Sequence, residues 1–381
     1  MKGAALAASA LAPLALMASM FAASTLAACS APHVPPEKAI HPLPASAIHP
    51  ADNATSPAKV ELGRALFWDP VLSGDRDIAC ATCHHPSFAY TDGLDVSIGV
   101  GGAGLGAARK PGARHHRTNR NAMTILDVVW NGVTSTTQPP AEKAPMFWDH
   151  RVVSLEEQAL RPMANLDEMR GEHFDEAAIL PEILSRLGAI AEYRTRFDEA
   201  FGPGPITERK LGQAIAAFER TLVDRGSSFD RFMAGDDGAL SHVAKRGLAA
   251  FVAAGCGSCH SGPLLSDFKL HRLGVPELPG ATPDPGAGEG HFRTPSLRNI
   301  MKTAPYMHNG LHKNIEDVLQ FYTDVVSSGK SQDPDLEDLR FGDGSHDDFM
   351  AFFEALSDGD FDRTIPAKVP SGLAPGGHIR P

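Results

Sequence analysis

Apolar residues recur at helical spacing in two well-separated stretches of the chain. The first lies between residues 206 and 223, where intervals of four, three and four place on one face Leu211, Ile215, Phe218 and Leu222. The second lies further along, and its apolar face consists of Ile315, Val318, Leu319 and Tyr322. No run alternates with strand period over a useful length. The pattern predicts a mainly α fold with long loops.

Local signals agree with short helices joined by loops. Ser154-Leu155-Glu156-Glu157 has the form of a capping box, which predicts the start of another helix. The chain contains 36 Gly and 30 Pro but only 7% aromatic residues. Such a content of turn formers is expected where loops surround a large cofactor.

The first 29 residues follow a different pattern, typical of a targeting segment. Lys2 supplies a positive charge, residues 4–23 are almost wholly apolar and small, and Leu26-Ala27-Ala28-Cys29 resembles a bacterial lipobox. An ordinary secretory signal with a chance cysteine is the alternative. The segment is predicted to be a lipoprotein signal peptide, with the lipid on Cys29 as the only contact with the membrane. An aspartate directly after the lipidated cysteine would act as a retention signal, but the residue at that position is Ser30. This favours a periplasmic location with anchoring to the outer membrane.

The remaining chain divides by composition and by its cysteines. Residues 30–57 are rich in Pro, Ala and Ser and are predicted to form a flexible tether, and residues 359–381 a C-terminal tail. Between them we predict an N-terminal domain at 58–204 and a C-terminal domain at 205–358. The net charge of −11 without a basic stripe argues against a nucleic-acid partner and suits a basic partner protein.

Each predicted domain contains one C-x-x-C-H motif. The two copies are Cys80-Ala81-Thr82-Cys83-His84 and Cys256-Gly257-Ser258-Cys259-His260. Two thiols three positions apart can each form a thioether with the same porphyrin, and the following residue then supplies an imidazole to the iron. The motifs predict two covalently bound haem c groups, with His84 and His260 as iron ligands.

Three other interpretations of the cysteines are a zinc site, thioredoxin-like redox pairs and structural disulfides. Zinc requires its two C-x-x-C halves closer together, whereas Cys80 and Cys256 are 176 residues apart (80 to 256). A thioredoxin pair follows a strand in a βαβ pattern, and no such pattern precedes either motif. Once Cys29 is set aside, the two motifs use every remaining cysteine, which favours haem attachment.

Longer stretches around these motifs carry a family resemblance. The chain resembles the bacterial diheme cytochrome c peroxidases and the related diheme enzyme MauG over residues 59–355. The matching stretches are Leu62–Pro70, Phe147–Arg151, Ser154–Ala159, Pro162, Glu168–Met169, Ala217–Leu222, Phe292–Asn299 and Thr303–Gly310. The resemblance implies two cytochrome c-like helical domains, haems near the shared interface, and reaction with hydrogen peroxide.

The resemblance also implies a peroxide site at the first haem. In several family peroxidases a loop histidine caps that iron, and its place here is occupied by Val100, which cannot ligate iron. The first haem is therefore expected to be five-coordinate or water-bound. His115 and His116 are alternative capping ligands, although we expect both to be exposed to solvent. Glu168 is implied as the general acid/base and Gln158 as the group that positions peroxide or water. Without the resemblance, Glu168 fits a surface carboxylate equally well.

The far ligand of the second haem is the most informative position. Family peroxidases usually have a methionine there, whereas the corresponding residue here is Tyr322, as in MauG. A phenolate stabilises oxidised iron and lowers the reduction potential, so such a haem collects electrons poorly but shares oxidising equivalents with its partner. A buried core tyrosine would show the same helical spacing. Met307, His308 and His312 are the alternative ligands.

Two further sites are implied by the resemblance alone. Trp148 corresponds to the tryptophan between the haems, through which electrons from a donor pass, although an ordinary core tryptophan is the alternative. One calcium ion is implied, held by the side chain of Asn121 and the backbone carbonyls of Thr303 and Pro305, which are the oxygen ligands that Ca²⁺ prefers.

Three functions compete on this basis. The first is a MauG-like oxidase that uses hydrogen peroxide and oxidises an unidentified donor protein, protein substrate or small donor. The second is a plain cytochrome c peroxidase that detoxifies peroxide with electrons from a small redox protein. The third is a diheme electron carrier without peroxide chemistry. Val100 argues against the carrier and Tyr322 against the plain peroxidase. The choice between a monomer and a homodimer stays open.

Overall fold

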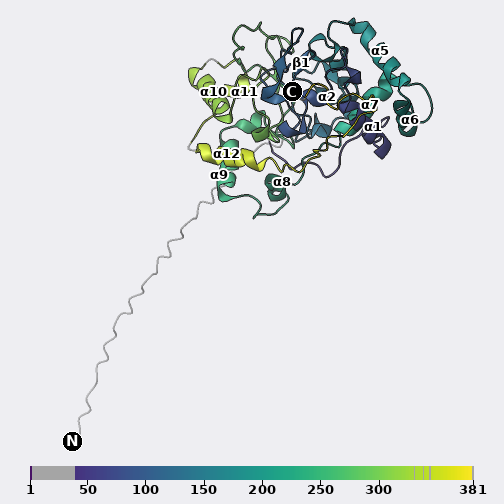
Figure 1. Ribbon diagram of the computed structural model, residues 1–381. Helices are drawn as coiled ribbons and strands as arrows, with labels where there is room; N and C mark the ends of the chain where they lie inside the picture. Colours follow the sequence, from purple (N-terminus) through teal and green to yellow (C-terminus); the bar gives the residue numbers. More distant parts are fainter. Residues whose placement is uncertain (2–38, 330, 338, 343–344, 380–381) are drawn as a thin grey trace. The chain divides into compact units, whose positions relative to one another are not determined.

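The computed structural model describes Met1 and residues 39–379, except positions 330, 338, 343 and 344. Cys29 and the predicted signal peptide after Met1 lie outside the described residues. The body is largely helical with long loops, as predicted (Figure 1). Its α-helices are α1 (Pro57–Trp68), α2 (Cys80–Cys83), α3 (Leu155–Gln158), α4 (Arg161–Ala164), α5 (Glu176–Ala189), α6 (Ala191–Phe201), α7 (Glu208–Glu219), α8 (Ser228–Met233), α9 (His242–Ala253), α10 (Ile315–Ser328), α11 (Pro334–Glu337) and α12 (His346–Ala355).

Short strands pair only locally. The antiparallel pairs are β1 (Gly102–Ala103) with β2 (Lys110–Pro111), β3 (Pro145–Met146) with β4 (Val152–Val153), and β5 (Leu270–His271) with β6 (Phe292–Arg293). Each strand has two residues, too short for the alternation that sequence reasoning looks for. Within the described part of the chain, every helix is too short or too polar to cross a bilayer.

The first hydrophobic core lies among α1, α5, α6 and α7 (Figure 1). Helix α7 contains most of the predicted apolar face, and its residues Leu211 and Ile215 are fully buried. Thr207 caps this helix by accepting a hydrogen bond from the Lys210 backbone N–H at 3.3 Å. Helix α1 crosses α7 at Gly63, where an added Cβ would lie 2.0 Å from the Ala214 carbonyl oxygen. Glycine is therefore required for this close approach.

The second core lies among α8, α9 and α12, and residues of α10 pack against it. Helix α9 precedes the second cysteine motif as α1 precedes the first. It also crosses its partner at a glycine, since a Cβ on Gly247 would lie 1.9 Å from the Asp348 carbonyl oxygen. Helix α7, which lies within the predicted C-terminal domain at 205–358, packs on α1 in the first core.

The described part of the predicted tether, residues 39–56, is packed against the body. Ile40 belongs to the second core, Leu43 donates its backbone N–H to Asp230 at 2.9 Å, and Trp130 donates its indole N–H to the Ser46 carbonyl at 3.1 Å. Asn53 is completely buried and donates to Glu156 at 2.8 Å. The prediction of a flexible tether up to residue 57 is therefore corrected for this segment, whose contacts a linker-like composition does not reveal.

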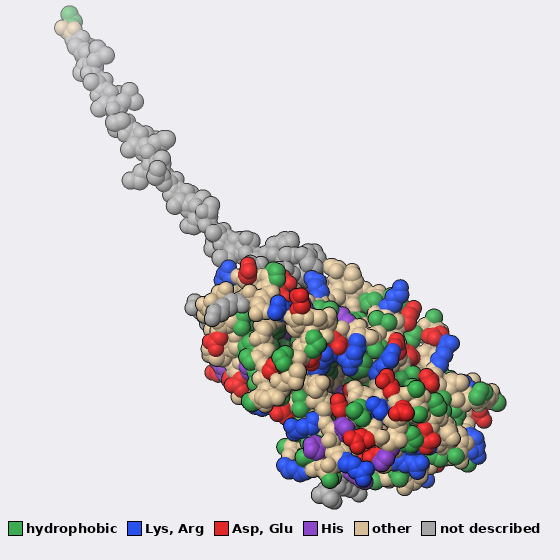
Figure 2. Space-filling view, turned by 90° about the horizontal axis from the view of Figure 1, so that it is seen from above, with side chains coloured by type: hydrophobic (Ala, Val, Ile, Leu, Met, Phe, Trp, Pro, Cys, Tyr) green, Lys and Arg blue, Asp and Glu red, His purple; other side chains and the backbone are tan. Residues whose placement is uncertain are grey.

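The C-terminal tail lies against the first cysteine motif. The Thr82 hydroxyl donates to the Gly376 carbonyl at 2.9 Å, and the Gly376 N–H donates to the Trp68 carbonyl at 2.7 Å. Phe361 and Val369 are buried with Tyr90. The C-terminal segment at residues 359–379 therefore packs behind α2. On the face shown in Figure 2, acidic and basic side chains are interspersed over the body.

Candidate functional site

The first cysteine motif forms one helical turn and the start of a loop. Cys80 and Cys83 begin and end α2, and both thiols are unpaired. His84 follows as the C-cap, and its Nδ1–H donates to the Tyr90 carbonyl at 3.0 Å. That hydrogen bond fixes the ring and leaves Nε2 as the ligand atom, the usual arrangement for a metal-binding histidine. The residues present therefore fit a covalently bound haem.

The second motif repeats this geometry. Cys256 and Cys259 are unpaired thiols, and His260 Nδ1–H donates to the Leu265 carbonyl at 2.9 Å. Burial raises the pKa of the Cys256 thiol to about 12 and that of Cys83 also to about 12. Burial thus keeps both thiols neutral when no haem is attached.

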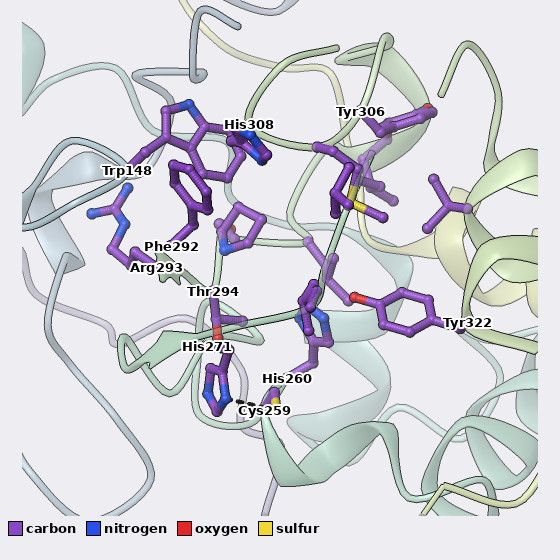
Figure 3. Close-up of a pocket in the computed structure, with 18 of the residues that line it drawn as sticks. Trp148, Cys259, His260, His271, Phe292, Arg293, Thr294, Tyr306, His308 and Tyr322 are labelled. Atoms are coloured by element: carbon purple, nitrogen blue, oxygen red, sulfur yellow. Dashed lines mark hydrogen bonds between the residues drawn. The ribbon is translucent and has the colours of Figure 1, made fainter. Parts of the chain in front are cut away.

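A large cavity opens in front of the second motif (Figure 3). Its volume is about 650 Å³, within the range of cofactor pockets. Among its lining residues are Cys256, Cys259, His260 and Tyr322, together with Trp148 and Asn121 from the first half of the chain. The cavity therefore lies where residues of the two halves meet and can hold a porphyrin.

Tyr322 lies on α10, as its helical spacing predicts. Figure 3 shows its hydroxyl pointing toward the imidazole of His260. Burial raises the pKa of the Tyr322 phenol well above its usual value, so the neutral form is favoured until a cation lies nearby. The geometry suits an iron held between these two side chains.

The alternative ligands are placed differently. His308 is buried and stacks on Phe292, with ring centroids 3.7 Å apart and an interplanar angle of 12°. Figure 3 shows it beside Trp148, away from His260. His312 is half-buried next to Phe321, at 5.3 Å between ring centroids. Met307 also lines the cavity.

The predicted peroxide site gathers beside the first motif. Val100 is buried, and its backbone N–H donates to the Glu168 carbonyl at 3.1 Å. Val100 shares the first core with Cys80 and Cys83. Glu168 lies in a π-helical turn (Leu166–Arg170), and its Oε1 accepts from the Asn165 amide at 3.1 Å. Burial raises the pKa of Glu168 to about 7, with a smaller contribution from Asp167. The Glu168 side chain is half-buried.

The surrounding residues differ in part from expectation. Gln158 is half-buried at the end of α3. That helix is one turn long. The Ser154 N–H donates to the Ala144 carbonyl at 2.9 Å and not to the Glu157 side chain, so the capping box is half formed. His115 is exposed as expected. His116 is not, because it is half-buried against Asp167, with Nδ1 and Oδ1 3.1 Å apart.

The comparisons with known proteins agree with this geometry. Residues 57–238 match the family model described as di-haem cytochrome c peroxidase. The cytochrome-c peroxidase IdrP1 of Pseudomonas sp. (strain SCT) is 34% identical, covering 90% of this chain and 91% of the relative. The methylamine utilization protein MauG of Methylorubrum extorquens is 34% identical and covers 82% of each chain.

The chain belongs to the di-haem cytochrome c peroxidase family. It is a peroxidase-type oxidoreductase whose family carries two haem c groups. A solved MauG-like protein associated with microbial copper homeostasis matches with a TM-score of 0.65 at 30% identity, covering 83% of this chain and 95% of that chain. The diheme peroxidase BthA of Burkholderia thailandensis E264 has the same fold, with a TM-score of 0.61 at 24% identity, covering 86% and 93%.

In this di-haem peroxidase, Trp148 is buried at the cavity, and its indole N–H donates to the Asn121 carbonyl at 3.0 Å. Asn121 donates its own amide to the Leu94 carbonyl at 2.8 Å, which leaves the amide oxygen as the group available to a cation. Thr303 and Pro305 line the same cavity. The three predicted calcium ligands are thus brought to one region.

Sequence reasoning missed several charged residues of the cavity wall. His271 lies between Asp267, at 3.1 Å, and Asp333, at 3.0 Å. Burial is the largest single influence and opposes its charge, but the hydrogen bonds and charges of Asp267 and Cys259 together outweigh burial and raise the pKa of His271 to about 11. Its ligand atoms and those of Cys259 and Asp335 lie within 4.8 Å of one another. A thioether at Cys259 removes the thiolate that a metal ion would require there.

Proposed function

We propose that this peroxidase reduces hydrogen peroxide at a haem attached through Cys80 and Cys83 and oxidises a donor through a second haem bound by His260 and Tyr322. The observation that carries the proposal is the Tyr322 hydroxyl directed toward His260 across the cavity (Figure 3). The haem irons supply the electron-transfer chemistry of peroxide reduction when bound. The protein supplies the open face, the proton transfer and the path to the donor.

Val100 accounts for the open face. A buried valine stands where several relatives place a capping histidine, and it offers no ligand atom. His116, the nearest alternative, is bound to Asp167 through its Nδ1. Neither Val100 nor the paired Nδ1 of His116 would then supply a ligand opposite His84, so peroxide could react there without a preceding reduction step.

Glu168 is proposed to move the proton. Its carboxylate would accept a proton from one oxygen of hydrogen peroxide and return it to the other oxygen, which would leave as water. A carboxyl with a pKa of about 7 serves both directions near neutral pH. Asn165 orients Oε1, and Gln158 is proposed to position the peroxide or a water molecule.

Tyr322 favours a MauG-like enzyme over a plain peroxidase. Iron beside the phenol would offset the burial that keeps it neutral, because a bound cation inverts the local effect on pKa. A phenolate ligand stabilises oxidised iron, so the second haem shares oxidising equivalents with the first. The donor, a protein or a small molecule, would then be oxidised through Trp148.

Calcium and cellular location complete the proposal. Asn121, Thr303 and Pro305 are proposed to hold one Ca²⁺, since they present oxygen donors to one cavity. The signal sequence and Cys29 support a periplasmic enzyme tethered to the outer membrane by lipid alone.

Electron paramagnetic resonance of the oxidised protein tests the open first haem. We expect one high-spin and one low-spin ferric signal, both lost after one equivalent of hydrogen peroxide. Two low-spin signals that persist with peroxide would instead indicate an electron carrier with both irons closed.

The ligand at the second haem is tested by Tyr322→Met. A thioether in place of a phenolate should raise the reduction potential of this haem and increase turnover with a reduced cytochrome, as in a plain peroxidase. Phe321→Met on the same helix is the matched control. An unchanged potential in Tyr322→Met would show that Tyr322 is not a ligand.

A further inference from the structure

Arg293 is a buried cation without a carboxylate partner. It is 6% exposed and lines the cavity beside Trp148 (Figure 3). Its Nη1 donates to the Pro145 carbonyl at 2.8 Å, and its Nη2 lies 3.2 Å from the sulfur of Met123. Its Nε is buried and has no hydrogen-bond partner among the described residues. All its polar contacts in the described chain are thus with neutral groups.

The surrounding residues do not neutralise this charge. The charge of Asp149 acts on Arg293, but this carboxylate is held by Arg120 at 2.7 Å and by Arg151 at 2.7 Å. His150 adds no charge, because burial and the neighbouring Arg293 lower its pKa to about 4. Burial lowers the pKa of Arg293 itself to about 10, so it is still protonated at neutral pH.

Other buried arginines in the same protein have the hydrogen-bond and ion-pair partners that Arg293 lacks. Arg220 and Arg298 each have side chains 2% exposed, and each is paired with a carboxylate, Glu156 at 2.5 Å and Asp230 at 2.8 Å. Arg109 has no such pair, but its nitrogens donate to three backbone carbonyls. A buried charge without compensation is costly, so a cation that faces a cavity indicates an anionic occupant.

We propose that Arg293 binds a propionate carboxylate of a haem at the wall formed by Trp148. The inference rests on the two haems of the proposed function. A backbone hydrogen bond also holds Arg293 beside Trp148, since the Arg293 N–H donates to the Trp148 carbonyl at 2.7 Å. The carboxylate can come from the first or the second haem, because residues of both halves of the chain line this cavity. Arg293 is a positioning residue that fixes a porphyrin edge and holds its charge.

The consequence is electrostatic. With Arg293 present, the propionate stays ionised, and the guanidinium balances its negative charge. Reduction of the iron by one electron is then accompanied by no uptake of a proton at the propionate. Without the cation, the buried carboxylate disfavours the added electron and takes up one proton when the iron is reduced. The potential of that haem should become more negative, and it should become pH-dependent near neutrality.

Redox titration monitored by electron paramagnetic resonance, using dithionite as reductant with mediators, tests this for each haem separately. In Arg293→Gln we expect the reduced-to-oxidised ratio of one haem to fall about tenfold or more at fixed potential, which is 59 mV for a one-electron couple. The haem that responds identifies the source of the propionate. Lys269→Gln removes a cation that is 70% exposed and lies 3.7 Å from Asp267; it is the control for loss of charge near the same wall and should change either potential much less than Arg293→Gln.

A second variant keeps the inference testable if Arg293→Gln does not fold. Arg293→Lys keeps the charge but not the paired donors, so its potentials should stay near those of the natural protein while the propionate bands in resonance Raman spectra shift. Two intact haems with unchanged potentials in Arg293→Gln and unchanged Raman bands in Arg293→Lys would overturn the inference. Fewer than two haems in the unmodified protein, measured as pyridine haemochrome, would overturn the proposed function instead.

Discussion

At the residue scale, Glu168 is the clearest link between burial and chemistry. Glu168→Gln keeps the shape of the side chain but cannot accept a proton, so the rate of reaction with peroxide should fall by about two to four orders of magnitude. Stopped-flow absorbance measures this rate. Glu172→Gln, whose side chain is 63% exposed, is the control. A loss of less than tenfold in Glu168→Gln would contradict the proposed role.

The same carboxyl sets a pH dependence. Its pKa is raised to about 7, and the proposed step begins from the carboxylate. The rate should therefore rise as the pH increases through 7 and level off above it. This limb should vanish in Glu168→Gln. A profile that is flat between pH 6 and 8 in the unmodified protein would rule out Glu168 as the group that titrates.

A second buried carboxyl, Glu219, affects stability. It is 5% exposed, its Oε2 lacks a partner among the described residues, and burial raises its pKa to about 8. The unfolded chain releases this proton near pH 4.5, whereas the folded chain retains it, so stability falls as the pH rises from about 4.5 to about 8. Between pH 5 and 8, Glu219→Gln should remove a decline of the order of 4 kcal/mol, since each pKa unit corresponds to about 1.36 kcal/mol. Thermal unfolding of both proteins at pH 5 and 8 measures the difference, and equal slopes would contradict the expectation.

The sequence identifies functional residues where neighbouring positions define their chemistry, and it does not identify those whose partners lie far away in the chain. The cysteine motifs were found because five consecutive residues define them, and Val100 and Tyr322 because they replace expected ligands. The contact of His116 with Asp167 spans 51 residues and that of Arg293 with Pro145 spans 148. Neither partner is marked by spacing, so polar contacts of this kind appear only in the folded structure.

At the scale of elements, helical periodicity predicts the two long apolar faces but not their packing. Helix α7 was expected in the second half because it follows residue 204, yet it packs on α1 of the first. The strand pairs of two residues each are defined by backbone pairing alone and leave no pattern in the sequence. Element type is thus encoded locally, whereas the boundary between the cores depends on contacts distant in sequence.

The crossing of α1 and α7 can be tested at Gly63. A Cβ there would lie 2.0 Å from the Ala214 carbonyl oxygen, so Gly63→Ala must separate the helices and should cost about 1–3 kcal/mol. Gly188→Ala near the end of α5 meets nothing within 4 Å and should stabilise slightly through helix propensity. Chemical denaturation compares the two. Equal midpoints would show that the crossing tolerates a side chain.

At the scale of the whole molecule, residues 39–56 join the two cores. Ile40 packs into the second core, while Asn53 is buried and donates to Gln213 in α7 at 3.0 Å. Between them, the Leu43 N–H reaches Asp230, which is also the ion-pair partner of Arg298. The segment therefore contributes to stability as an integral part of the fold and does not merely connect it to an anchor.

Two truncations separate these roles, each produced behind a foreign signal peptide and compared with the full mature chain. A chain that begins at residue 39 keeps the hydrogen bonds of Leu43, Trp130 and Asn53, so its melting temperature should match that of the full mature chain. A chain that begins at residue 57 loses these bonds and the burial of Ile40, leaving Asp230 and Glu156 with fewer donors. We expect its melting temperature to fall by about 2 °C or more, since the loss exceeds 1 kcal/mol. If both truncations melted together with the full chain, residues 39–56 would have no part in holding the cores, and the flexible tether predicted from composition would extend to α1.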